Sequence, residues 1–201
     1  LVTTDVEHSA NMKFGQMHEK RGGEVSWIPV DRAGQIDVHQ LQEAIREDTA
    51  IVSVMLANNE TGVVFPIEEI AAICRIKGVP FHTDAVQTAG KLQLDVKAMG
   101  VDFLSLSAHK LHAPKGIGLL YARQGVAWQP YVIGGGQESG RRGGTENVAY
   151  IVAFGKAAEL AMASVENDVD RIRALRDRME TVIMDSIPGV TRNGAKEPRL
   201  P

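Results

Sequence analysis

The residues best suited to chemistry lie in the segment SLSAHKLHAPKGIG, from Ser105 to Gly118. Ser107, His109 and Lys110 directly follow an apolar stretch, and a proline and two glycines favour a turn just afterwards. A lysine at the end of a strand can have a lowered pKa and act as an amine nucleophile or form a Schiff base. Ser107 and His109 could donate hydrogen bonds to a phosphate. An exposed loop lysine is the alternative interpretation, and this segment alone does not decide between them.

A second candidate is FHTDAVQ, from Phe81 to Gln87. Asp84 follows an apolar stretch and precedes Gln87 by three residues, so one helical turn could direct both side chains at one ligand. A carboxylate in a covered site needs a cationic partner, and a protonated pyridine nitrogen would serve. The alternative is an aspartate that caps a helix.

Two further polar segments follow predicted strands. In NNETG, the amides of Asn58 and Asn59 could bind a phenolate or a substrate carboxylate, although an asparagine-rich turn is the alternative. His8 in VEHSA follows the first strand, where a lone histidine is more often a packed or capping residue than a catalyst. No pair of histidines has a spacing that predicts a metal site.

The segment GGGQESGRRGGTEN, residues 134–147, predicts a long glycine-rich loop. It matches neither the dinucleotide-binding fingerprint nor the P-loop. Its polar members Arg141, Arg142 and Thr145 would suit an anion or a contact with another subunit, while simple flexibility is the alternative.

Alternating strands and helices must position these residues. The hydrophobic pattern predicts strands near 1–4, 24–30, 51–57, 80–85, 101–107 and 117–122. Helices are expected at about 9–20, after Asp37, after Pro66 (with Cys74 facing the core) and twice after the glycine-rich loop, the second ending at Pro188. This order predicts an α/β fold with a mainly parallel sheet flanked by helices. Active residues of such sheets gather beyond the carboxyl ends of the strands.

Composition limits the classes of function. The 201 residues carry a net charge of −3, so the basic excess of a nucleic-acid or membrane-surface binder is missing. The single cysteine, Cys74, excludes an intrachain disulfide and a cysteine-based zinc site and fits a reducing compartment. No apolar run approaches the roughly 18 residues of a membrane span, and no signal peptide is recognised. Because the chain starts directly with a predicted strand, we expect a fragment of a longer protein.

Together these segments resemble the cysteine desulfurases, pyridoxal-phosphate enzymes that supply sulfur for iron–sulfur cluster assembly. The similarity runs through all 201 residues, in order, and its motifs are VEHSA, MLANNETGVVFPI, FHTDAVQTAGK, SLSAHKLHAPKGIGLLY and GGGQESGRRGGTENV. It implies the large domain of the aspartate-aminotransferase type (fold type I), working as a cytoplasmic homodimer. Residues 1–164 would be the central part of that cofactor-binding domain, and residues 165–201 a linking helix and the start of a small C-terminal domain.

The resemblance also implies roles for individual residues. Lys110 matches the lysine that binds pyridoxal 5′-phosphate covalently and later moves protons, and Asp84 matches the carboxylate that keeps the pyridine nitrogen protonated. Gln87 matches the residue that hydrogen-bonds the ring hydroxyl, and His8 the catalytic imidazole stacked on the ring. Asn59 matches the amide near the ring hydroxyl and the substrate carboxylate.

The remaining matches concern the cofactor phosphate. Ser107 and His109 match ligands of the phosphate in their own subunit. Thr145 matches the threonine that reaches the phosphate of the neighbouring subunit. The resemblance implies no metal ion.

The reaction implied by the resemblance removes sulfur from L-cysteine and leaves L-alanine. A cysteine thiolate takes up the sulfur as a persulfide and passes it to a sulfur-acceptor or iron–sulfur scaffold protein. That cysteine, a substrate-binding arginine and a further phosphate-binding threonine are expected outside these 201 residues, so Cys74 is expected to be structural and this chain alone inactive. The alternatives are a selenocysteine or cystine lyase of the same fold and a non-catalytic scaffold module.

Overall fold

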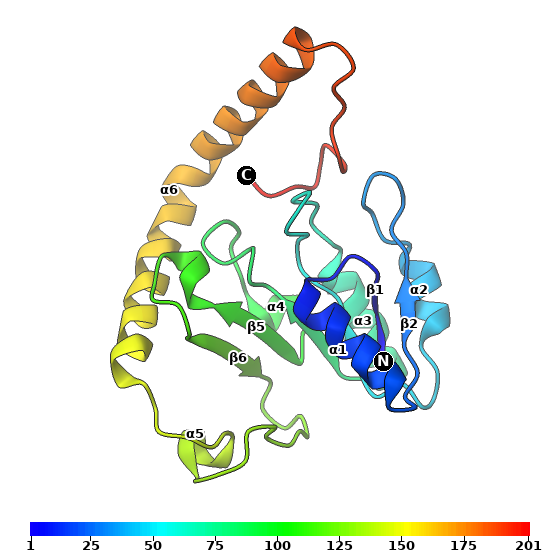
Figure 1. The fold of residues 1–201 in the computed structure, drawn as a ribbon, viewed down its shortest axis with the longest axis vertical. Coiled ribbons are helices and arrows are strands. Elements are labelled where there is room, and N and C mark those ends of the chain that lie inside the picture. The colour runs from blue at the N-terminus through cyan, green and yellow to red at the C-terminus, as the bar shows by residue number, and fades with distance from the viewer.

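The computed structural model describes residues 1–201 apart from the side chain of residue 166, and its centre is a six-stranded sheet (Figure 1). The spatial order is β2-β1-β3-β4-β5-β6; the first five strands are parallel and β6 is antiparallel to β5. In chain order the strands are β1 (Val2–Thr4), β2 (Ser26–Ile28), β3 (Val52–Ser53), β4 (Phe81–Asp84), β5 (Phe103–Ser107) and β6 (Gly118–Ala122). The predicted α/β class with a mainly parallel sheet is confirmed.

The strand β3 is shorter than the apolar run that predicts it. A strand was expected over residues 51–57, but only Val52–Ser53 form regular strand structure. Backbone hydrogen bonds nevertheless continue along β4, from Val54 N to His82 O at 3.1 Å and from Leu56 N to Asp84 O at 2.9 Å. The chain therefore runs beside β4 as far as the loop that carries the two asparagines.

The helices begin and end largely where capping residues predict. Asp37 caps α2, where its Oδ1 accepts hydrogen bonds from the backbone N–H groups of His39 and Gln40. Gly78 ends α3 with a φ of 70°. The helical elements are α1 (Ser9–Lys20), α2 (Val38–Ala44), α3 (Ile67–Lys77), α4 (Val96–Met99), the 3-10 helix η1 (Ala108–Leu111), α5 (Gln137–Gly140) and α6 (Val148–Ser186).

The main core lies between the sheet and the layer formed by α2, α3 and α4. Leu41, Ile70 and Phe81 are fully buried there, and Cys74 is packed among them as its helical stripe predicts. A second, smaller cluster joins η1 to α6 through Leu111 and Phe154. The turn that carries Lys110 is therefore packed against α6.

The sequence predicted two helices after the glycine-rich loop, and this prediction is wrong. The single helix α6 has 39 residues and extends beyond the sheet (Figure 1). Its interior contains no proline, and pairs such as Arg171–Asp168 at 3.0 Å and Arg173–Asp170 at 2.6 Å support it at i,i+3 spacing. The helix stops before Pro188, as expected. The division of the chain at residues 164 and 165 falls within α6 and stays a prediction.

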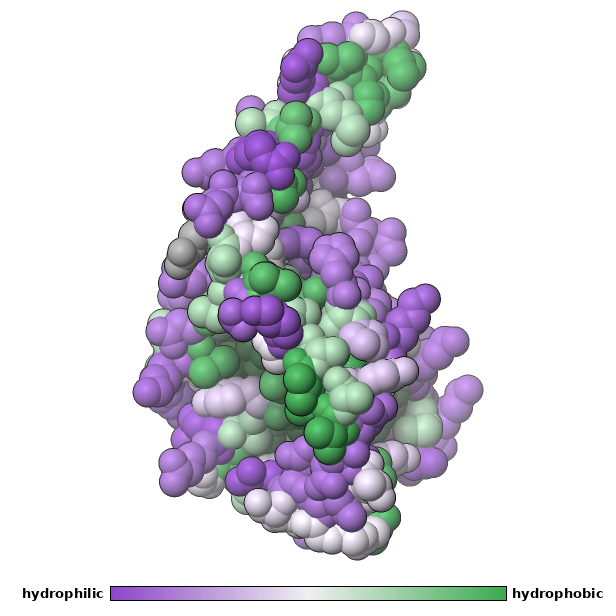
Figure 2. Space-filling model, turned by 90° about the vertical axis from the view of Figure 1, so that its left-hand side faces the viewer, coloured by the Kyte–Doolittle hydropathy of each residue, from purple (hydrophilic) through white to green (hydrophobic). Residues whose placement is uncertain are grey.

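A second correction concerns apolar length. The segment Val148–Val165 of α6 is long and apolar enough to cross a membrane by length and composition. The sequence analysis found no such run because Lys156 and Glu159 interrupt it. Only 6% of the segment is buried within this chain, and Figure 2 shows hydrophobic residues among hydrophilic ones on this side of the molecule. Helices packed inside soluble proteins share this length and composition, so the segment alone does not assign a membrane span.

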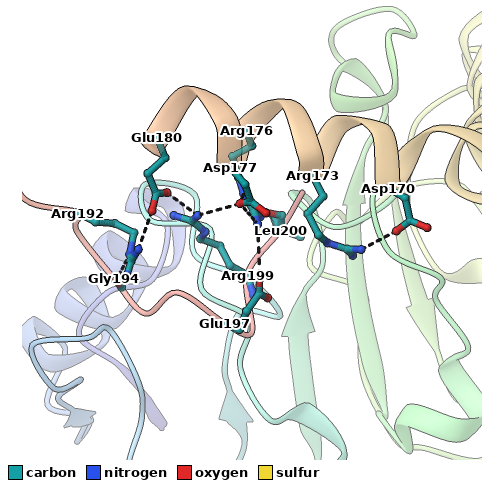
Figure 3. A network of polar contacts seen from close by, with 10 residues as sticks. All are labelled: Asp170, Arg173, Arg176, Asp177, Glu180, Arg192, Gly194, Glu197, Arg199 and Leu200. Atoms are coloured by element: carbon teal, nitrogen blue, oxygen red, sulfur yellow. Dashed lines mark hydrogen bonds and ion pairs between the residues drawn. The ribbon is translucent and has the colours of Figure 1, made fainter. Parts of the chain in front are cut away.

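The C-terminal segment folds back from the end of α6 towards the sheet. Glu180 on α6 accepts hydrogen bonds from Arg192 at 2.6 Å and from Arg199 at 2.5 Å (Figure 3). Arg199 also forms a β-bridge with Val63, in the loop after β3. Arg176 donates to the main-chain oxygen of Leu200, and Leu200 N donates to the Gly62 oxygen at 2.8 Å, so the end of the chain is held between α6 and that loop.

Candidate active site

The topology creates a crevice at the carboxyl ends of β1 and β3. In the sheet, β1 lies between β2 and β3. The chain passes from β1 to β2 on one side of β1 and then crosses to β3 on its other side, so the loops that follow β1 and β3 lead away from each other. His8 and Asn59, which lie in these two loops, line a common cavity of about 430 Å³. The structure thus brings these two predicted site residues together.

The turn after β1 is held by a buried carboxyl that the sequence analysis missed. Glu7 Oε1 accepts hydrogen bonds from Met55 N at 2.7 Å and Thr4 Oγ1 at 3.0 Å, and Oε2 accepts from Asn11 Nδ2 at 3.2 Å. Burial outweighs these three donors and raises the pKa of Glu7 to about 7. His8 follows directly as the N-cap of α1, with Nδ1 accepting from a backbone N–H and the ring exposed.

The two asparagines after β3 have different roles. Asn58 Oδ1 accepts from the backbone N–H groups of Glu60 and Thr61, both at 2.9 Å, and its Nδ2 donates to the Val6 oxygen at 3.1 Å. Asn58 is therefore a turn residue that ties the loop after β3 to the loop after β1. Asn59 donates to Glu60 and lines both the 430 Å³ cavity and a neighbouring cavity of about 290 Å³.

The carboxyl end of β4 supplies the second pair of predicted residues. Asp84 is half-buried, and its Oδ1 accepts from Val86 N at 2.9 Å, so it caps a turn and not the helix of the alternative interpretation. Gln87 lies one turn further on and lines the 290 Å³ cavity together with Asn59. The spacing of Asp84 and Gln87 therefore places both at the carboxyl edge of the sheet.

A polar chain crosses three strands close to Asp84. His82 Nδ1 lies 2.8 Å from Ser53 Oγ on β3, and its Nε2 lies 2.9 Å from Ser105 Oγ on β5. Burial lowers the pKa of His82 and favours the neutral imidazole, although the charge of Asp84 acts in the opposite direction. Residues i and i+2 of a strand share a face, so His82 and Asp84 point to the same side of β4.

The loop after β5 contains the strongest sequence motif. Ser107 ends β5, and its Oγ lies 2.8 Å from His109 Nδ1 on η1. His109 and Lys110 are exposed at the carboxyl edge of the sheet. The charge of Lys110 contributes to a lowered pKa of Lys91, behind burial, so the two amines are close enough to interact. Lys110 therefore belongs to the same region as Gln87 and Asn59.

Thr145 is not brought to this site within the chain. It is exposed in the loop after β6, and because β6 runs antiparallel, that strand leads to the opposite edge of the sheet. Its role in a neighbouring subunit stays a prediction. Cys74 is also remote from the site: it is buried on α3, and burial raises the pKa of its thiol to about 12. The expectation that Cys74 is a packed core residue is confirmed.

The donor set at the carboxyl edge fits pyridoxal 5′-phosphate by its chemistry. It offers an amine for the aldehyde, a carboxylate for a ring nitrogen, amides for a ring oxygen and hydroxyl and imidazole groups for a phosphate. These groups belong to Lys110, Asp84, Gln87, Asn59, Ser107 and His109. Among the described side chains, no group of three or more His, Cys, Asp or Glu residues could hold a metal ion.

A family model and the sequences of known proteins both match this chain over almost its whole length. The sequence model of the family Aminotransferase class-V matches residues 1–201. The chain is 52% identical over 200 residues to cysteine desulfurase 2 of Trichormus variabilis, and the match covers 100% of this chain and 50% of that protein. This chain thus spans about half the length of the curated relatives it matches.

Solved structures agree with this assignment of fold. A NifS-like protein superposes with a TM-score of 0.88 at 38% identity, covering 92% of this chain and 51% of that one. SspA, solved in complex with cysteine, superposes with a TM-score of 0.76 at 41% identity, covering 79% of this chain and 46% of that one.

Proposed function

Because the chain belongs to the class-V aminotransferase family, whose cofactor is pyridoxal 5′-phosphate, we propose that it forms the cofactor site of a cysteine desulfurase. The observation that carries the proposal is the gathering of His8, Asn59, Asp84, Gln87 and Lys110 beyond the carboxyl ends of four adjacent strands. Relatives named cysteine desulfurase and a related structure in complex with cysteine support the same reaction.

Each side chain has a task that its position allows. Lys110 would hold the cofactor's carbonyl carbon and, once released, move protons at the substrate. Asp84 would pair with the ring nitrogen, and bound pyridoxal phosphate would supply an electron sink for negative charge beside the substrate amine. His8, exposed at the start of α1, would stack on the ring.

The remaining ligands would fix the cofactor at its other atoms. Gln87 and Asn59 would bind the ring oxygen, with Asn59 also near the substrate carboxylate. Ser107 and His109 would bind the phosphate in the same subunit. Thr145 would reach the phosphate of a second subunit, which makes a homodimer part of the proposal.

In the proposed overall reaction, one thiol accepts the sulfur of the substrate. The carbon–sulfur bond of L-cysteine breaks, a sulfur–sulfur bond forms on a thiol that becomes a persulfide, and L-alanine is released. The persulfide sulfur would then pass to a sulfur-acceptor or iron–sulfur scaffold protein. The buried Cys74 is unsuited to take up this sulfur, because an acceptor thiol must be exposed and ionised.

The proposed reaction is tested by measuring L-alanine and sulfide released from L-cysteine in the presence of a reducing thiol. The assay uses the longest natural polypeptide that contains this sequence, loaded with pyridoxal 5′-phosphate. We expect equal amounts of both products, a large loss in Asp84→Asn and no loss in the matched control Asp185→Asn, an exposed residue at the end of α6. Alanine from L-selenocysteine alone would support the lyase alternative, and no alanine from either substrate would contradict the proposal.

A further inference from the structure

The cavity beside Gln87 contains a lysine to which no role has been given. Lys91 lines the 290 Å³ cavity with Asn59 and Gln87. Its Nζ donates to the main-chain oxygen of Gln87 at 2.8 Å and lies 3.5 Å from Gln87 Oε1. The preceding Gly90 has a φ of 74°, and a Cβ there would lie 2.8 Å from a methyl carbon of Leu111. Glycine adopts this backbone conformation without strain and leaves room for Leu111.

Lys91 is a half-buried cation with no carboxylate partner among the described side chains. Its partners are the two oxygens of Gln87, and the charge of Lys110 adds to burial in lowering the pKa of Lys91. The acidic side chain in the cavity wall, Glu60, accepts a hydrogen bond from Asn59 instead.

The other cations of the cavity wall are already paired. Arg176 forms an ion pair with Asp177 at 2.7 Å, and Arg199 forms one with Glu180 at 2.5 Å (Figure 3). Their charge is thus balanced by α6 itself. Lys91 remains as the lining cation whose charge is available to a ligand.

The contact with Lys91 also decides which way the Gln87 amide faces. An ammonium group donates hydrogen bonds and accepts none, so the amide atom nearest to it must be the oxygen. The Nε2 group, which donates two hydrogen bonds, then faces away from Lys91. A ligand atom that meets Nε2 must be an acceptor, and a nearby cation favours an acceptor with negative charge.

We propose that Lys91 is a positioning residue, which orients the Gln87 amide so that the site selects an anionic ring oxygen of the cofactor. This inference rests on the proposed function, because the anionic oxygen is the deprotonated ring hydroxyl of pyridoxal 5′-phosphate. Lys91 acts through Gln87, so the effects of changing the two residues must depend on one another.

A double-mutant cycle tests this dependence through cofactor affinity, which requires no turnover. The apoprotein is titrated with pyridoxal 5′-phosphate and followed by absorbance. We expect Lys91→Met to weaken binding roughly three- to tenfold, and to weaken it less than about twofold when Gln87→Met is already present. The matched control Lys97→Met, at an exposed lysine of α4, should bind as the unchanged protein does. Equal losses in both backgrounds would overturn the proposal.

Two further variants separate charge from structure. Lys91→Gln keeps a donor for the main-chain oxygen of Gln87 but removes the charge, and we expect it to behave like Lys91→Met. Lys91→Arg keeps the charge and should recover most of the affinity. In both uncharged variants, the pH midpoint of the bound cofactor's absorbance change should rise by about half a unit, because a lost cation disfavours the anionic oxygen.

A cofactor analogue without the ring hydroxyl provides the final test of the proposal. Its affinity should be the same in the unchanged protein and in Lys91→Met, because the atom that Lys91 and Gln87 recognise is missing. An equal loss for the analogue and for pyridoxal 5′-phosphate would contradict the proposal and leave the proposed function standing. Failure of the unchanged protein to bind pyridoxal 5′-phosphate would defeat the proposed function and this inference together.

Discussion

The buried carboxyl of Glu7 makes a quantitative prediction about stability and pH. Its pKa is about 7 in the folded protein against an ordinary value of 4.5, because burial disfavours the charged form and the charge of Asp84 adds to this. The folded state therefore binds this proton more tightly than the unfolded state does. The contribution of the protonated Glu7 to stability is therefore full below pH 4.5, falls as the pH rises and is lost above pH 7.

The size of the effect follows from the shift in pKa. A pKa difference of roughly 2.5 units at about 1.4 kcal/mol per unit gives a total of about 3.5 kcal/mol, of which about 2 kcal/mol appears between pH 5.5 and pH 8. Glu7→Gln removes this titration. Its Oε1 can still accept from Met55 N and Thr4 Oγ1, and Asn11 can turn its amide to accept from the new Nε2.

Urea unfolding followed by circular dichroism, repeated between pH 5.5 and pH 8, measures the prediction. The free energy of unfolding of Glu7→Gln relative to the unchanged protein should rise by about 2 kcal/mol over this range. Glu69→Gln, at an exposed position on α3, is the matched control and should show a constant difference. A difference for Glu7→Gln that does not change with pH would refute the reasoning.

Other predictions address the core and the cofactor face. Burial raises the pKa of Cys74 to about 12, so the native thiol should react with an aromatic disulfide reagent only as fast as the protein opens, whereas the urea-unfolded chain should react at once. Cys74→Ser should lower stability by about 1–3 kcal/mol and leave sulfide release unchanged; a persulfide on Cys74 after cysteine treatment would contradict this. Burial lowers the pKa of His82, so stability should fall as the pH drops below 6.5, and His82→Phe should remove that dependence. Leu41→Ala should lower the free energy of unfolding in urea by about 2–5 kcal/mol, because Leu41 is fully buried. A loss below about 1 kcal/mol would contradict this and show that neighbouring side chains fill the cavity.

Much of the fold was predictable because its signals are local. Asp37 and Pro66 mark helix starts, and the stripe that includes Ile70 and Cys74 marks the face that packs on the sheet. The direction of β6 was not predictable, since an apolar run is the same for a parallel and an antiparallel strand. The continuity of α6 was also missed, because the change from an apolar to a charged half resembles a helix boundary in the sequence.

Some residues of the candidate site could be predicted from the sequence and others could not. His8, Asp84 and Lys110 could be found because each lies at the end of a predicted strand or within a few residues of it, where α/β enzymes hold their ligands. Glu7 and His82 were missed because their partners are distant in the sequence: Glu7 meets Met55 across 48 residues, and His82 meets Ser53 across 29. Such pairs form only once the sheet has its order and register.

The central claim is that the carboxyl edge of this sheet binds pyridoxal 5′-phosphate through Lys110. Reduction of the loaded protein with borohydride fixes the cofactor to the amine that holds it, and peptide mapping by mass spectrometry then identifies that residue. We expect one phosphopyridoxyl group per chain, on Lys110, and none in Lys110→Ala, while the control Lys115→Ala, at an exposed position in the next turn, keeps the label. A label on Lys91, Lys115 or any other lysine, with Lys110 unmodified, would contradict the account.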